Sequence, residues 1–198
     1  MRKVIYTSMV TLDGFIEGPN HKLGWEIIDE ELHRFVNERE RAIGLHLYGR
    51  RMYELMESFW PTADANPANP AFEIEYSTIW KSIPILVFSK SLERVEGNAR
   101  LVRDDPAGVV ARLKEEPGKD IGIGGAILAS ALVERDLIDG YQLYVHPVVL
   151  GSGTRLRLAL NGPINLRLVE THTFNTGAVF LHYQRINEEL NQSLPRND

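Results

Sequence analysis

Hydrophobic and polar positions alternate in blocks along the chain, and the blocks predict strands that alternate with helices. Short runs rich in β-branched and aromatic residues, such as VIYTSM and ILVF, are typical of buried strands. Stretches with apolar residues three or four positions apart, such as Leu32, Phe35 and Val36, are typical of helices that cover a sheet. We predict strands at 4–9, 43–48, 85–88, 121–123 and 141–145, and helices that begin near 29, 50, 71, 105 and 126.

The last part of the chain departs from this alternation. Residues 166–174 and 178–185 have strand character with no helix between them, and Asn175-Thr176-Gly177 suits a turn. We therefore predict an α/β fold of three layers, with a mostly parallel central sheet flanked by helices and an antiparallel hairpin at its C-terminal edge. The length fits a single domain, which we place at 1–187, with 188–198 as a frayed tail.

Charge and composition narrow the range of partners. The net charge of −5 argues against nucleic acid and against an anionic membrane surface. The N-terminus has no signal-peptide pattern, and no apolar run approaches the roughly 20 residues of a membrane helix, so we expect a cytoplasmic protein. The absence of cysteine excludes disulfides and thiolate catalysis, and the six histidines show no metal-ligand spacing, so no metal site is predicted.

Two predicted strand ends carry groups that suit phosphate. Gly124 and Gly125 lie between a strand and a helix, where free backbone N–H groups favour an anion, although a tight turn would also explain both glycines. Gly49 precedes Arg50 and Arg51 in the first turn of another helix. Their charge opposes the helix dipole there, so they are placed either for a phosphate or simply in solvent.

A third strand end carries Ser89 and Lys90, which suit another phosphate or an ordinary polar loop. Because the carboxyl ends of parallel strands share one edge, the three segments together favour a dinucleotide with separated phosphates. Asp13 follows the first strand, where a carboxylate either orients a substrate and relays a proton or stabilises a turn. His146 ends a strand beside GSGTRL and is a further residue that could face a ligand.

Six segments follow one another in an order that spans nearly the whole chain: SMVTLDGFIEG, LYGRRMYE, ILVFSKSL, DIGIGGAILASALVERDLID, YQLYVHPVVLGSGTRL and LRLVETHTFNTGAVFLHY. This ordered set resembles the dihydrofolate-reductase-like family. It is most similar to the reductase domain of the bifunctional riboflavin-biosynthesis deaminase–reductase and to the stand-alone relatives of that domain.

The resemblance implies an oxidoreductase that uses NADPH to reduce a small heterocyclic substrate, as the phosphoribosylaminouracil reductase of riboflavin biosynthesis does. It implies that Asp13 lies near the nicotinamide and the substrate. It also implies a distributed cofactor site, in which Gly49, Arg50 and Arg51 meet the pyrophosphate or the adenosine phosphate, Ser89 and Lys90 meet the 2′-phosphate, and Gly124, Gly125, Ala126 and Ile127 hold the pyrophosphate.

Three departures from the family pattern leave alternatives open. Met52 stands where relatives usually have threonine, no Leu-Pro pair precedes the acidic residues Asp29 and Glu30, and no zinc-deaminase signature is present. A non-catalytic NADPH-binding sensor or interaction module and a true dihydrofolate reductase therefore stay as alternatives.

Arg155 and Arg157 would supply charge for a substrate phosphate, or form an exposed basic loop.

The segment YQLYVHPVVL reads as a long apolar strand edge, which a monomer would leave open to aggregation. We therefore expect a homodimer that covers it, in keeping with the dimers common among members of the family.

Overall fold

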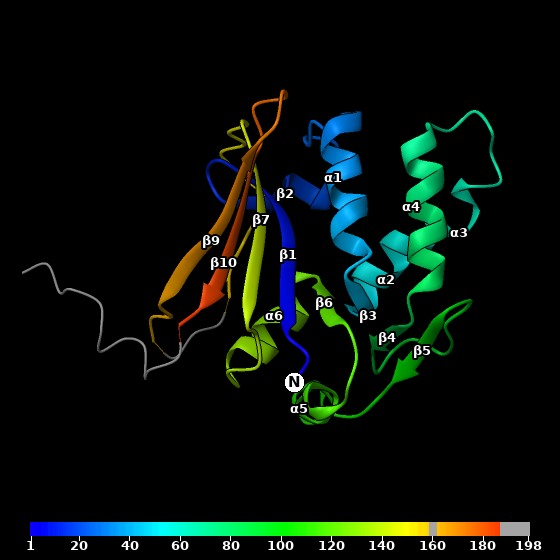
Figure 1. Cartoon of the computed structure of the whole chain (residues 1–198), viewed down its shortest axis with the longest axis vertical. Coiled ribbons are helices and arrows are strands. Elements are labelled where there is room, and N and C mark those ends of the chain that lie inside the picture. Colours follow the sequence, from blue (N-terminus) through cyan, green and yellow to red (C-terminus); the bar gives the residue numbers. More distant parts are fainter. Residues whose placement is uncertain (159–161, 187–198) are drawn as a thin grey trace, which may run out of the picture.

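The computed structural model describes residues 1–158 and 162–186, so the predicted tail at 188–198 lies outside the described residues. One eight-stranded sheet, in the order β5-β4-β3-β6-β1-β7-β10-β9, forms the centre (Figure 1). The pairs from β5 to β7 are parallel, and β10 is antiparallel to both β7 and β9. The strands of this sheet are β1 (Val4–Thr11), β3 (Ile43–Gly49), β4 (Ile85–Phe88), β5 (Ala99–Val102), β6 (Asp120–Gly124), β7 (Gly140–His146), β9 (Leu166–Thr173) and β10 (Val179–Arg185).

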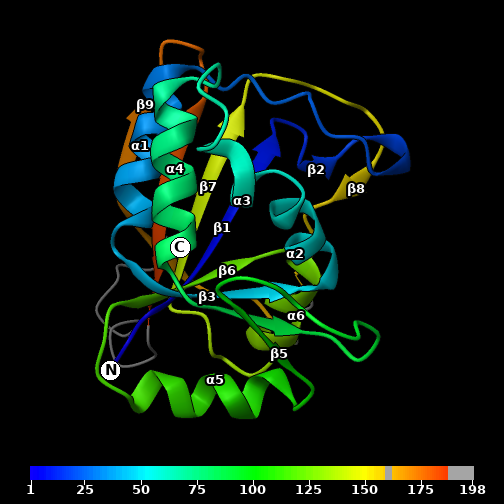
Figure 2. The same cartoon turned by 90° about the vertical axis from the view of Figure 1, so that its right-hand side faces the viewer.

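Helices cover both faces of the sheet. The helices are α1 (Glu30–Glu40), α2 (Arg50–Glu57), α3 (Trp60–Ala63), α4 (Ala71–Ser82), α5 (Pro106–Glu115) and α6 (Ala126–Val133), with a 3-10 turn η1 at Pro19–His21. Helices α1 and α4 run side by side along one face, and α5 and α6 lie on the other (Figures 1 and 2). The predicted three-layer α/β architecture with a mostly parallel sheet is confirmed.

The apolar faces of the helices explain this arrangement. On one side Val110 of α5 and Leu132 of α6 pack against Leu47 and Ile123 of the sheet. On the other side Leu32 of α1 packs with aromatic residues of β7 and β10. Each helix layer buries the apolar face that the spacing of its hydrophobic residues predicts. Burial of these faces is the main source of stability for such a fold.

Helix ends follow the capping signals of the sequence. Asp29 accepts a hydrogen bond from the backbone N–H of Leu32 at 2.9 Å and caps α1, and Asp105 caps α5 through Gly108 at 3.2 Å. Pro106 stands in the first turn of α5, where its missing N–H has no intrahelical partner to lose. In α1 and α5 the predicted start lies within one residue of the observed one.

The structure differs from the sequence-based expectations at four points. β5 was missed because its four residues lack a clear apolar alternation, and the short pair β2 (Phe15–Glu17) and β8 (Thr154–Arg155) lies in segments expected to be loops. The proline-rich stretch after α2 contains the single turn of α3. The prediction that YQLYVHPVVL is an exposed edge is wrong, because β7 pairs with β1 on one side and β10 on the other. The edge strand at that end is β9.

Candidate functional site

The three segments with phosphate-binding character meet at one edge of the sheet. They follow β4, β3 and β6, which are consecutive parallel neighbours, and their ends are in register: Gly49 pairs with Phe88, and Tyr48 with Gly124. The prediction that these strand ends share one edge is confirmed. β1, which leads to Asp13, is the next strand beyond β6.

The turn between β6 and α6 depends on both of its glycines. Gly125 is the N-cap of α6 and has a φ of 96°, a backbone conformation that a side chain strains. A Cβ on Gly124 would lie 2.9 Å from Cγ of Met52 and 3.0 Å from Cε1 of Tyr48. Tight packing therefore accounts for Gly124, while the free N–H groups of the first turn of α6 have no side-chain cap and remain available to an anion.

Helix α2 begins in the same way one strand further along. Its N-cap is Gly49, and no side chain caps its first turn. Arg50 donates to Glu54 at 2.7 Å and to Oγ of Ser91 at 3.2 Å, which links α2 to the segment after β4. Arg51 forms an ion pair with Glu17 of β2, with Nη2 2.6 Å from Oε1. Both arginine side chains are half-exposed, so both guanidinium groups are accessible from solvent.

The segment after β4 is an ordered turn. Oγ of Ser89 accepts hydrogen bonds from the N–H groups of Ser91 and Leu92, at 3.2 and 3.1 Å, and Lys90 projects from the turn as an exposed residue. Sequence analysis missed Arg103, whose guanidinium donates to the carbonyl oxygens of Ser89 and Leu92 at 3.0 and 2.6 Å. Recognising β5 in the sequence would have revealed Arg103, because this residue directly follows β5 at the same edge of the sheet.

Asp13 joins the turn after β1 to the loop after β7. Oδ1 accepts from the hydroxyl of Thr11 at 2.6 Å and from the N–H of Leu150 at 3.2 Å, and Oδ2 accepts from the N–H of Gly151 at 2.8 Å. The hydroxyl of Thr11 and these backbone donors lower the pKa of the Asp13 carboxyl below its ordinary value. Its ionised carboxylate thus holds two loops together, which supports the interpretation that Asp13 stabilises a turn.

The loop that Asp13 holds leads to the basic residues Arg155 and Arg157. A hollow of about 320 Å³ is lined by both arginines together with Phe15, Gly153 and Thr154. The guanidinium of Arg155 lies over the ring of Phe15 at 4.5 Å from its centroid and donates to the carbonyl oxygen of Asp13. The two arginines make this hollow suitable for an anionic group. Arg155 also contacts Phe15 and Asp13, so only part of its guanidinium is free for a ligand.

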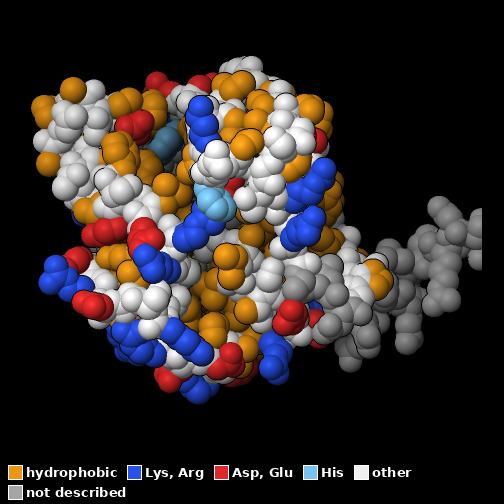
Figure 3. All heavy atoms as spheres, turned by 180° about the vertical axis from the view of Figure 1, so that it is seen from behind, with side chains coloured by type: hydrophobic (Ala, Val, Ile, Leu, Met, Phe, Trp, Pro, Cys, Tyr) orange, Lys and Arg blue, Asp and Glu red, His pale blue; other side chains and the backbone are white. Residues whose placement is uncertain are grey.

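Figure 3 views the side of the molecule that carries β2, β8, α2 and α6, which lie to the right in Figure 2. Lysine and arginine side chains stand there in separate groups with acidic side chains among them, and hydrophobic side chains show in the middle of the face. One of the apolar residues at this edge is Ile127, in the first turn of α6, whose side chain is 80% exposed. The face therefore offers apolar area as well as charge to a ligand.

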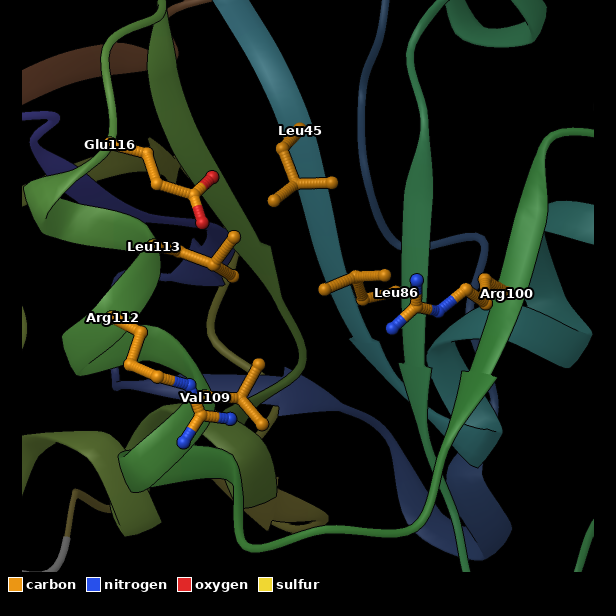
Figure 4. A pocket seen from close by; sticks show the side chains of 7 residues that line it. All are labelled: Leu45, Leu86, Arg100, Val109, Arg112, Leu113 and Glu116. Atoms are coloured by element: carbon orange, nitrogen blue, oxygen red, sulfur yellow. The ribbon is translucent and has the colours of Figure 1, made fainter.

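A second cavity, of about 350 Å³, lies elsewhere. It opens between α5 and the first halves of β3, β4 and β5, away from the carboxyl ends of the strands (Figure 4). Its lining is Leu45, Leu86, Arg100, Val109, Arg112, Leu113 and Glu116. It shares no lining residue with the predicted cofactor site.

The residues at the strand ends fit the phosphates of a dinucleotide. Two helix N-termini without side-chain caps, an exposed lysine on an ordered turn, and two half-exposed arginines lie along consecutive strands. In the part of the chain that the structure describes, no group of three His, Asp or Glu side chains could hold a metal ion, and no helix is long and apolar enough to cross a membrane.

Comparison with known proteins agrees with this geometry. The family described as the RibD C-terminal domain matches residues 2–180. The chain is 36% identical over 185 residues to the protein named uncharacterized protein YyaP of Bacillus subtilis (strain 168), covering 92% of this chain and 94% of that protein. It is 29% identical over 187 residues to YwjB of the same strain, covering 93% and 98%.

Solved structures share the fold. A putative riboflavin biosynthesis protein from Shewanella sp. PV-4 aligns with a TM-score of 0.69 at 19% identity, over 93% of this chain and 99% of that one. The Thermotoga maritima deaminase/5-amino-6-(5-phosphoribosylamino)uracil reductase aligns with a TM-score of 0.64 at 16% identity, over 93% of this chain but only 57% of that one. The coverage agrees with the absence of deaminase motifs in this sequence.

Proposed function

The chain belongs to the RibD C-terminal domain family, and from this we propose that it is an NADPH-dependent reductase of a small heterocyclic substrate, resembling 5-amino-6-(5-phosphoribosylamino)uracil reductase. One observation carries the proposal. Helices α2 and α6 both begin at the ends of neighbouring parallel strands, each with a glycine N-cap and no side chain on its first-turn N–H groups. This pair of anion sites suits a cofactor with separated phosphates.

Bound NADPH would supply a hydride from its nicotinamide ring, so the protein has to bind, orient and shield rather than provide the redox chemistry. The N–H groups at the start of α6, after Gly124 and Gly125, would hold the pyrophosphate, and the positive φ of Gly125 shapes the turn that presents them. Lys90 and the hydroxyl hydrogen of Ser89 would face the 2′-phosphate.

Within this proposal Asp13 is a positioning residue. Both of its carboxylate oxygens already accept hydrogen bonds, so it fixes the turn after β1 against Leu150 and Gly151. That turn lies one strand from the start of α6, where the nicotinamide end of the cofactor would follow the pyrophosphate. Arg155 and Arg157, which line the adjoining hollow, would meet a phosphate of the substrate.

The cofactor assignment is tested by titrating the protein with NADPH and NADH and comparing the wild type with Lys90→Gln. We expect NADPH to bind more tightly, and the variant to lose on the order of tenfold in NADPH affinity with NADH unchanged, because a charged contact to the 2′-phosphate is removed. Lys3→Gln is the matched control, since Lys3 precedes β1 at the opposite edge of the sheet. Equal affinity of the wild type for the two cofactors would contradict the role given to Ser89 and Lys90.

Turnover separates the proposed reductase from the other two functions. Oxidation of NADPH is followed with a ribosylaminouracil phosphate, with dihydrofolate, and with a panel of small carbonyl compounds. Reduction of dihydrofolate alone would indicate a dihydrofolate reductase. Tight NADPH binding without oxidation by any of these compounds would indicate a sensor.

A further inference from the structure

The cavity between α5 and the sheet has an apolar floor. On the sheet side, Leu86 of β4 is in register with Arg100 of the outermost strand, β5, and Leu45 of β3 lies next to them. On the helix side, the lining residues are three or four positions apart and so share one face of α5 and its C-terminal end: Val109, Arg112, Leu113 and Glu116. Leucine and valine side chains from both layers therefore face the same open space (Figure 4).

Two arginines bring unpaired positive charge to this apolar floor. Figure 4 shows the guanidinium of Arg100 reaching from β5 toward Leu86, and that of Arg112 lying beside Val109. Both arginines are exposed, and neither forms an ion pair or a side-chain hydrogen bond with any residue that the structure describes. The two charges are thus free for a ligand that enters the cavity from solvent.

One carboxylate, that of Glu116, also lines the cavity. Glu116 comes four residues after Arg112, but the side chain of Arg112 turns toward Val109 and that of Glu116 toward Leu113 (Figure 4). No ion pair joins Glu116 to Arg112 within the described part of the chain. Two guanidinium groups and one carboxylate leave one net positive charge, and this charge lies at the end of the cavity away from Glu116.

We propose that this cavity binds a small organic acid, in which a carboxylate is attached to a single apolar ring. The carboxylate would lie between Arg100 and Arg112, which enter the cavity from the sheet and from the helix, because guanidinium groups match the geometry of a carboxylate. The ring would cover the apolar floor at Leu86 and Leu113. Inorganic phosphate would leave this floor uncovered, and a purely apolar compound would leave both arginines without an acceptor.

The size of the cavity agrees with such a ligand. Its volume of about 350 Å³ is at the small end of the range of ligand pockets, which runs from roughly 300 to 1,000 Å³. A compound with one ring suits this volume better than a dinucleotide does. The proposal is independent of the reductase function, because the cavity opens at the first halves of the strands and the cofactor site lies at their carboxyl ends.

The proposal is tested with three probes in an NMR titration of the full chain, which follows the backbone amide resonances. Phenylpropanoate has both the ring and the carboxylate, phenylpropanamide replaces the charge with a neutral amide, and propanoate lacks the ring. We expect phenylpropanoate to shift amides of β4, β5 and α5. It should bind about fivefold more tightly than either of the other probes, because only it uses both the arginines and the apolar floor.

Substitutions at exposed positions of the cavity test its charges without disturbing the core. Arg112→Gln should bind phenylpropanoate about fivefold more weakly, with phenylpropanamide unchanged. Glu116→Gln removes a like charge and should strengthen the binding of phenylpropanoate about twofold. Arg135→Gln is the matched control, because Arg135 is exposed after α6 and does not line the cavity, so all affinities should stay the same.

Equal affinity of the wild type and Arg112→Gln for phenylpropanoate would overturn the proposal, as would equal affinity of the wild type for the acid and the amide. Saturating NADPH should leave the binding of phenylpropanoate unchanged. Displacement by NADPH would mean that the acid occupies the helix starts of α2 and α6 instead, and this too would overturn the proposal. Shifts of the same amides with protein concentration and none with the probe would assign the cavity to a second copy of the chain and refute a ligand there.

Discussion

At the scale of single residues, the glycines at the strand ends have different reasons to be glycine. Gly125 needs its positive φ, whereas Gly124 has an ordinary backbone and is fixed by what lies against it. The side chain of Met52 fills the space beside Gly124. The sequence pointed to the pair, but it did not reveal that α2 packs against one of its members.

The substitution Gly124→Ala should lower the free energy of unfolding by about 1–3 kcal/mol, because its Cβ would overlap Met52 and Tyr48 in a packed place. Gly108→Ala is the control. Gly108 lies inside α5, where a Cβ meets nothing closer than 3.9 Å, so alanine should be neutral or stabilise by up to about 1 kcal/mol. Urea unfolding measures both changes. A Gly124→Ala protein as stable as the wild type would show that the glycine turn is looser than described.

At the scale of elements, periodicity and capping residues were sufficient for long helices and buried strands. Asp29 and Asp105 marked helix starts that the structure confirms. Short elements were missed, because β2 and β8 have three and two residues and so carry no period. Because β5 was not predicted, Arg103 was not recognised as a residue of the site. Its guanidinium stabilises the turn at Ser89 through a hydrogen bond between segments that are separated in the sequence.

Loss of Arg103 should loosen the Ser89 turn and weaken NADPH binding. For Arg103→Gln we expect a several-fold rise in the NADPH dissociation constant and little change for NADH, because each of the two hydrogen bonds contributes on the order of 1 kcal/mol to the turn. Arg94→Gln is the control, since Arg94 is 86% exposed and pairs only with Glu96 in the described structure. The affinities are measured by fluorescence titration. An equal loss of affinity for NADPH and NADH would argue that the turn does not contact the 2′-phosphate.

At the scale of the whole molecule, the order of the strands explains what the sequence could and could not predict. The alternation of strands and helices predicted a parallel sheet, and hence that ends far apart in the sequence would gather at one edge. It did not predict which strand would be outermost, because this depends on the pairing between strands, which leaves no pattern in the sequence of a single strand. The ring contact between Trp25 and His146 was also not predictable, since it depends on the loop before α1 packing against the end of β7.

We propose that the chain forms a homodimer through β9, whose Leu168 and Val169 are 49% and 51% exposed on a strand with one unpaired edge. Light scattering should give about twice the chain mass of 22.5 kDa. Val169→Lys should shift the protein toward the monomer while its circular dichroism stays unchanged. Phe59→Lys, a charge added to an exposed apolar position that is not on β9, should leave the dimer intact. A wild-type protein with the mass of one chain would refute the dimer.

The ion pair between Arg51 and Glu17 bears on how tightly a phosphate can be held. Burial alone would raise the pKa of the Glu17 carboxyl, but the hydrogen bond from His21 and the charge of Arg51 lower it overall, so Glu17 is ionised at neutral pH. A phosphate that approached Arg51 would replace a carboxylate already in place. Binding there would be an exchange of anions, and its free energy would be the difference between two similar contacts. Added salt screens both contacts alike, so ionic strength should affect cofactor binding less than the number of arginines at this edge suggests.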